Sequence, residues 1–159
     1  MKKLVFALVA VAALCACQKS GAPVDFNYRG LAFTMPVSQF VDSMAARGFA
    51  VDSAASDSGN NVVLASPAEH YRVLAAFKGE QLMVVQETYN LSTNDSTREM
   101  WQEIRDGLEK ELGAWPDCPV LKDDHKEANF DAGEGLISVL LENTYTPTLT
   151  VRYTKKNAQ

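Results

Sequence analysis

The chain has 159 residues, of which 47% are hydrophobic and 22% are charged, and its formal net charge is −5. This length and composition suit a single domain built around one hydrophobic core. The acidic balance argues against a nucleic-acid-binding protein, since affinity for the phosphate backbone depends on clustered Lys and Arg residues. It also argues against electrostatic attraction to anionic lipid.

The N-terminus predicts export from the cytoplasm. Lys2 and Lys3 precede an uninterrupted apolar run over residues 4–14. A helix that crosses a bilayer needs about 20 apolar residues, so this run is too short to span one. A basic start, a short apolar stretch and small residues before a cut are typical of a secretory signal peptide. We therefore expect residues 1–16 to be removed as a signal peptide.

The run ends in Leu14-Cys15-Ala16-Cys17, which has the pattern of a bacterial lipobox. In that case the Cys17 thiol receives a diacylglyceryl group, the chain is cut before Cys17, and the new amine is acylated. Stable anchoring needs more than one acyl chain, because each buried methylene contributes only about 0.8 kcal/mol. An ordinary signal peptide that leaves a free Cys17 is the alternative. Gln18, at the position where Asp would retain a lipoprotein in the inner membrane, favours the outer membrane, facing the periplasm.

The remaining chain is predicted to form a tether over residues 17–25, one domain over residues 26–155 and a tail over residues 156–159. Without Lys2 and Lys3, 13 basic residues stand against 20 acidic ones, and the formal charge is −7. Cys118 is then the one thiol that lipidation does not use, so it has no partner for an internal disulfide. We interpret it as a small buried residue, with an intermolecular disulfide as the alternative.

The first half of the domain predicts a strand, a helix and a hairpin. A short strand is expected over residues 26–33, followed by a helix in which Pro36 occupies the first turn and Gly48 is the stop. Short strands are expected over residues 49–52 and 62–65, with a polar loop between them. Residues 71–77 and 82–89 alternate around a turn at Lys78-Gly79-Glu80, which is the clearest hairpin pattern in the chain. In its second strand the pattern places Leu82, Val84 and Gln86 on one face and Met83, Val85, Glu87 and Tyr89 on the other.

The second half predicts a long helix and a second hairpin. Ser96 and Glu99 have the spacing of a capping box. Trp101, Ile104, Leu108 and Leu112 then share one helical face, which Gly113 ends. Residues 114–119 are expected to be a rigid turn and residues 122–134 a polar, acidic loop. Residues 137–142 and 149–153 alternate as a hairpin. This order predicts an α+β fold, an antiparallel sheet with helices packed on one face.

Four stretches carry a resemblance to a known group. They are Tyr28-Arg29-Gly30-Leu31, residues 40–44 with Arg47-Gly48-Phe49, Phe77-Lys78-Gly79, and residues 101–112 with Gly113 and Pro116. Together they resemble small secreted lipoproteins of Gram-negative bacteria that have the β-lactamase-inhibitor-protein-like fold, which the outer-membrane assembly lipoproteins of the SmpA/OmlA type share. The resemblance implies a non-catalytic binding role in envelope assembly or inhibition, and it supplies no catalytic residues.

Two segments have a partial similarity to known catalytic or cofactor-binding motifs. Ser56-Asp57-Ser58-Gly59 has a faint similarity to the nucleophile loop of chymotrypsin-like proteases, but that chemistry needs a His held by a carboxylate, and His70 and His125 are the only histidines. We interpret residues 56–59 as a loop tip. Gly133-Glu134-Gly135 precedes a strand and so does not match a dinucleotide-binding turn.

Acidic residues crowd one segment: Asp123, Asp124, Glu127, Asp131 and Glu134 surround His125. Their spacing does not fit a calcium-binding loop, so a solvated acidic loop is expected. If a metal ion binds, His125 and its neighbouring carboxylates are the place. Trp115, beside Pro116, has two open interpretations, a core residue at the helix exit or an exposed anchor for a partner.

These features predict a lipid-anchored protein of the cell envelope with a non-catalytic, protein-binding or scaffold role in the periplasm. An inhibitor of an envelope-directed enzyme, such as a lysozyme, a protease or a β-lactamase-like target, is the alternative, and a hydrolase would need a site that the sequence does not display. The expected contacts are the membrane, through the lipid on Cys17, and a protein partner in the envelope. No catalytic residue, cofactor or metal site is predicted.

Overall fold

The computed structural model describes residues 26–57, 60–66 and 71–156. The predictions of a signal peptide, of lipidation at Cys17 and of a tether lie outside these residues, as does His70. The elements in chain order are β1 (Asn27–Tyr28), β2 (Leu31–Ala32), α1 (Val37–Ala45), β3 (Ala50–Val51), β4 (Asn61–Ser66), β5 (Tyr71–Lys78), β6 (Gln81–Asn90), α2 (Asn94–Leu112), β7 (Asp117–Lys122), β8 (His125–Asp131), β9 (Gly135–Glu142) and β10 (Thr148–Lys155).

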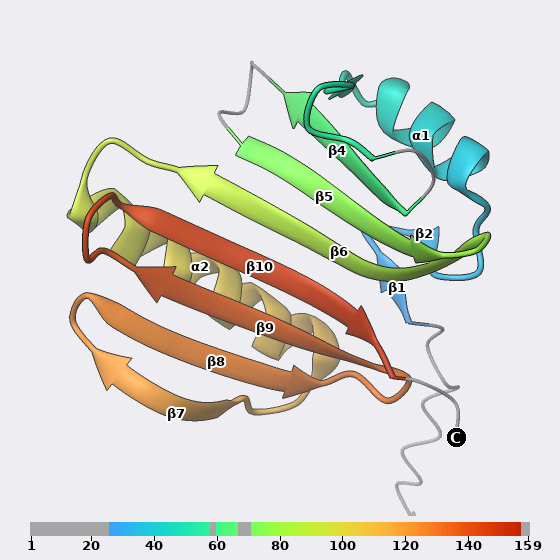
Figure 1. Ribbon diagram of the computed structural model, residues 1–159. Helices are drawn as coiled ribbons and strands as arrows, with labels where there is room; N and C mark the ends of the chain where they lie inside the picture. Colours follow the sequence, from blue (N-terminus) through green and yellow to red (C-terminus); the bar gives the residue numbers. More distant parts are fainter. Residues whose placement is uncertain (1–25, 58–59, 67–70, 157–159) are drawn as a thin grey trace, which may run out of the picture.

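One eight-stranded antiparallel sheet dominates the fold, in the order β3-β4-β5-β6-β10-β9-β8-β7 (Figure 1). Both predicted hairpins are confirmed, as β5 with β6 and as β9 with β10. The last strand, β10, also pairs with β6, so it joins the two hairpins at the centre of the sheet. Because β6 and β10 are far apart in sequence, only the folded chain brings these hairpins together.

Both helices pack on the same face of this sheet, as the predicted α+β architecture requires. Figure 1 shows α2 behind β9 and β10. The Trp101 indole of α2 donates a hydrogen bond of 3.2 Å to the Val139 carbonyl of β9. Farther along the same face, the rings of Phe40 in α1 and Phe77 in β5 meet edge to face at 5.9 Å. The small β1–β2 hairpin fills the space between the helices, with the Tyr28 ring 6.4 Å from Phe40 and 5.3 Å from Tyr153.

The predicted first strand is in fact a hairpin. Asn27 pairs with Ala32 and Tyr28 with Leu31, around a turn at Arg29 and Gly30. Both turn residues have positive φ, 49° at Arg29 and 81° at Gly30. Positive φ at both central positions suits the right-handed twist of a tight hairpin, and Gly adopts it without a steric penalty. The turn therefore reverses the chain where the alternation alone predicted continuation.

The ends of the helices differ from the prediction by a few residues. Thr93, not Ser96, is the N-cap of α2, and its side chain accepts the Ser96 backbone N–H. Thr and Ser are both good capping residues, so the local sequence does not choose between them. Pro36 is the N-cap of α1 rather than a residue of its first turn. Gly113 ends α2 with φ of 61°, as predicted.

The prediction of a rigid turn and an acidic loop after α2 is wrong. Residues 114–134 instead contain β7 and β8. These two strands pair with each other, and β8 also pairs with β9. In β8 only Ala128 and Phe130 are buried. Strands near the edge of a sheet bury few side chains, so their sequence resembles a loop.

The predicted faces of β6 are wrong at its start, because the strand contains a bulge. Leu82 lies opposite Phe77 and Val84 opposite Ala76, which leaves Met83 as the extra residue. A bulge of this kind shifts the side-chain alternation by one residue. Leu82 therefore lies in the core together with Val85, although the alternation had placed them on opposite faces.

Candidate functional site

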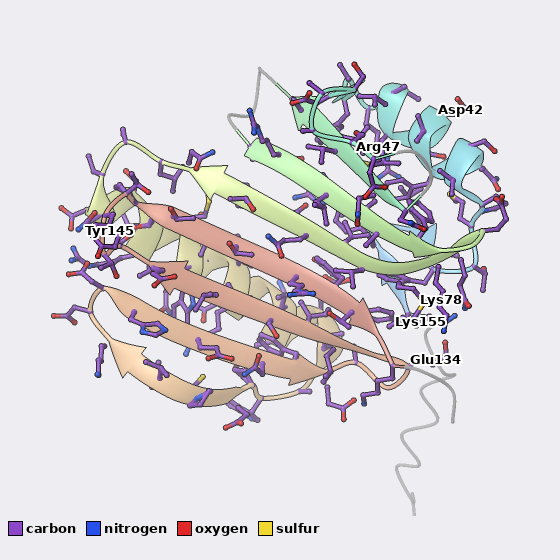
Figure 2. All side chains as sticks on the ribbon, viewed as in Figure 1. Asp42, Arg47, Lys78, Glu134, Tyr145 and Lys155 are labelled. Carbon is purple, nitrogen blue, oxygen red and sulfur yellow. The ribbon has the colours of Figure 1, made fainter. Side chains whose placement is uncertain are left out.

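The sheet face opposite the helices is the first candidate site. In the described part of the chain it carries neither helix, and it faces the viewer in Figures 1 and 2. Arg152 of β10 lies at its centre, directly opposite Gln86 of β6 and Ser138 of β9. We define the uncovered face as the central residues on this side, which are Leu74, Ala76, Val84, Gln86, Thr88, Ser138, Leu140, Thr150, Arg152 and Thr154.

The uncovered face combines apolar and hydroxyl side chains around a single charge. Arg152 is exposed and forms no hydrogen bond or ion pair with another residue that the structure describes. Other charged side chains on the same side, such as Arg72, Lys78 and Glu127, lie farther out or at the strand ends. The centres of protein interfaces are depleted of charged residues but enriched in Arg, so this pattern is typical of a binding surface.

A buried carboxylate is the second feature of note. Glu87 points into the core from β6 and is only 2% exposed. It accepts hydrogen bonds from the hydroxyls of Tyr28, at 2.7 Å, and Tyr89, at 2.8 Å. The Arg29 guanidinium lies 2.8 Å from the same carboxylate. Three donors from two segments therefore satisfy one buried charge. We call these four residues the Glu87 cluster.

The electrostatics of the Glu87 cluster raise the pKa of its tyrosines further above physiological pH. Burial raises the pKa of Tyr28 and of Tyr89, and the negative charge of Glu87 raises both further. Partial burial by itself lowers the pKa of Arg29, but the attraction of Glu87 outweighs it and the pKa is raised. Tyr28 and Tyr89 thus remain donors at physiological pH. The cluster connects the β1–β2 hairpin to the sheet, which is a structural role.

The sequence contains one signal for the buried position of Glu87. Alternation had already placed Glu87 on the same strand face as Val85 and Tyr89. A carboxylate in an apolar row must be paired if the row is buried, since an isolated buried charge is costly. The partners could not be identified in the same way, because Tyr28 is 59 residues away in the sequence.

The loop with Ser56 is confirmed as a loop for the residues that are described. The Ser56 hydroxyl donates to the Asp52 carbonyl at 2.7 Å and accepts the Val63 N–H at 2.9 Å. The Asp57 carboxylate accepts hydrogen bonds from Asn61 and Asn60, which lower its pKa. These bonds close the loop. His125 begins β8, which is separated from β4 by four strands, so it does not lie beside Ser56.

The acidic residues after α2 are dispersed along β8 and its flanking turns. Asp124 accepts hydrogen bonds from Asn143, at 3.2 Å, and from Arg98, at 2.6 Å, and these bonds lower its pKa. Asp131 pairs with Lys156 at 2.7 Å. Within residues 26–57, 60–66 and 71–156, no group of three or more His, Cys, Asp or Glu side chains is placed to hold a metal ion.

Trp115 and Cys118 follow α2. Trp115 is 84% exposed, so its interpretation as a core residue is wrong. Leu121 of the edge strand β7 is also exposed, at 64%. Cys118 is half-buried, packs against the core and has a free thiol. The core position near the helix belongs to Trp101 instead, which is 2% exposed.

Comparison with protein-family models gave no match, and comparisons with curated proteins and with solved structures gave no significant match. Neither helix in the described part of the chain has the length and apolar character needed to cross a membrane. The class that the structure defines is an α+β protein with one covered and one uncovered sheet face.

Proposed function

We propose that this chain is a lipid-anchored lipoprotein of the cell envelope, whose domain binds a partner protein through the uncovered face. The lipobox at Cys17 supports the anchor, and Gln18 favours the outer membrane, facing the periplasm. The observation that supports binding is the exposed Arg152 at the centre of the uncovered face. The resemblance to SmpA/OmlA-type lipoproteins agrees with such a role and remains a prediction.

The uncovered face has the properties that a reversible interface needs. Arg152 lies on β10, which is hydrogen-bonded to a strand on each side, so the backbone loses little conformational freedom when a partner binds. Leu74 and Leu140 supply apolar area, while hydroxyls such as those of Thr88 and Thr150 tolerate solvent. The partner that fits this face presents a carboxylate to Arg152 and apolar side chains around it.

The anchor is tested by replacing Cys17 with alanine. The unmodified protein should fractionate with the outer membrane, and the variant should lose membrane association because it cannot be acylated. Replacing Cys118 with alanine is the matched control and should leave fractionation unchanged. Immunoblots of separated membrane and soluble fractions measure both. Continued membrane association of the Cys17→Ala variant would show that the lipobox interpretation is wrong.

The binding surface is tested by replacing Arg152 with glutamate. Crosslinking in the native envelope, affinity capture and mass spectrometry should recover one dominant partner. We expect Arg152→Glu to reduce its recovery at least about tenfold, since reversing a central interface charge typically costs several kcal/mol. Arg72→Glu, nearer the edge of the same side, should have a much smaller effect. Equal recovery with the Arg152→Glu and unsubstituted proteins would exclude this face as the interface.

The identity of the captured protein separates the two roles predicted from the sequence. A subunit of an envelope assembly would support a scaffold. An enzyme that loses activity when this protein is added would support an inhibitor. If Arg152→Glu abolishes that inhibition, the same face serves the second role.

A further inference from the structure

A cavity of about 140 Å³ opens at the end of the sheet where the described chain begins. Most of its lining is apolar and comes from Phe26, Leu108, Leu112, Ala132, Ile137 and Tyr153. It lies on the helix side of the sheet and is therefore separate from the uncovered face. An apolar cavity of about 150 Å³ holds one benzene-sized molecule, so this volume matches a single aromatic ring.

The walls of the cavity are held in place by packing. The Phe26 ring lies 4.5 Å from the ring of Phe33 and directly over Gly135. A Cβ atom at position 135 would come within 2.3 Å of the Phe26 ring, so a residue with a side chain cannot replace Gly135 without displacing that ring. The Tyr153 ring meets Tyr28 edge to face at 5.3 Å. Packing thus holds in place two of the aromatic rings that line the cavity.

The rim of the cavity carries one uncompensated negative charge. Asn27, Arg29 and Glu111 form the polar part of the lining. The positive charge of Arg29 is balanced by Glu87, 2.8 Å away. Glu111 is exposed and makes no ion pair with any residue in the described part of the chain. Burial raises the pKa of Tyr153 and the charge of Glu87 raises it further, whereas Arg29 lowers it. The charge of Glu111 has a smaller raising effect, so its field reaches the cavity.

We propose that this cavity binds a small organic cation, a single aromatic ring joined to an ammonium group by a short linker. The ring occupies the space between Phe26 and Tyr153, and the ammonium group pairs with the carboxylate of Glu111. The rings of Phe26 and Tyr153 pack against the aromatic ring of the ligand, and offset or edge-to-face ring pairs of this kind are favourable. An exposed ion pair contributes little, so the charge of the ligand sets a preference rather than a high affinity.

Two matched probes test the proposal, 2-phenylethylamine as the cation and 3-phenylpropionate as the anion. Each is titrated into the full chain while NMR follows the signals of Ile137 and Tyr153. We expect the amine to bind in the millimolar range, about threefold or more tightly than the acid, as an exposed ion pair allows. Glu111→Gln should remove this preference. Glu103→Gln, on the same helix but outside the cavity lining, should retain it.

A third variant tests the position of the ring. Ala132→Leu should fill part of the cavity and weaken the binding of both probes. If this variant does not fold, the comparison of Glu111→Gln with Glu103→Gln still decides the matter. Equal binding of both probes, a preference that persists in Glu111→Gln, shifts that map outside the cavity, or no shifts at all would each overturn the proposal.

Discussion

Replacing Arg29 with methionine should lower the free energy of unfolding by about 2 kcal/mol. Removing one partner of a buried ion pair usually costs more, about 3–5 kcal/mol, because the other charge is left uncompensated. Here the effect is smaller, since the Arg29 side chain is 46% exposed. Glu87 also keeps the hydroxyl donors of Tyr28 and Tyr89. Urea unfolding followed by circular dichroism measures the change.

A double-mutant cycle with Glu87→Gln shows whether charge is the cause. The amide keeps an acceptor for the tyrosines but carries no charge, so Arg29→Met should cost less in the Glu87→Gln background than in the unsubstituted protein. Arg152→Met is the control, because Arg152 has no described partner, and it should change stability by less than about 0.5 kcal/mol. Additive effects of Arg29→Met and Glu87→Gln would contradict the role assigned to the ion pair.

Replacing Trp101 with alanine should have a still larger effect, a loss of about 4 kcal/mol. Large-to-small substitutions of buried aromatic residues cost about 3–5 kcal/mol, because they combine lost burial with an unfilled cavity. The Trp101 side chain is fully buried, and its indole N–H donates to the Val139 carbonyl. Its ring also lies within 5.6 Å of the Arg105 guanidinium and 5.4 Å of the Lys126 ammonium. The substitution therefore removes a buried ring and a hydrogen bond that join α2 to the sheet.

The second tryptophan provides the matched control for this prediction. Trp115→Ala removes an equally large side chain, but one that is 84% exposed. It should change the free energy of unfolding by less than about 0.5 kcal/mol. Denaturant midpoints of both variants, compared with the unsubstituted protein, give the difference. Similar losses for the two variants would mean that the assignment of one tryptophan to the core and the other to the surface is wrong.

Arg29→Met and Trp101→Ala test how two different elements are attached to the sheet. Trp101 connects α2 to the half of the sheet that contains β9, whereas the Glu87 cluster connects the β1–β2 hairpin to the half that contains β6. In the proposed anchoring, the tether from Cys17 leads directly into β1. The Glu87 cluster then joins the anchored end of the domain to the sheet. It lies on the covered face, opposite the face that carries Arg152.

Local patterns in the sequence determined the parts of the fold that depend on near neighbours. Alternation predicted both hairpins, and helical spacing with Gly113 predicted the face and end of α2. Hairpins and helices are closed by contacts between residues near in sequence, so their signals are contained in short windows. The α+β class and the placement of helices on one face followed from the order of these elements.

The tertiary structure alone decided three things. β7 and β8 became strands because β9 offered a free edge, although their few buried side chains gave little periodicity. Trp115, for which the sequence left two interpretations open, is 84% exposed and lies outside the core. The Glu87 cluster and the cavity beside Phe26 each combine residues that are far apart in the sequence. The isolation of Arg152 likewise depends on which strands lie on either side of β10. Such contacts depend on how the hairpins pair through β10, and no short stretch of sequence encodes that pairing.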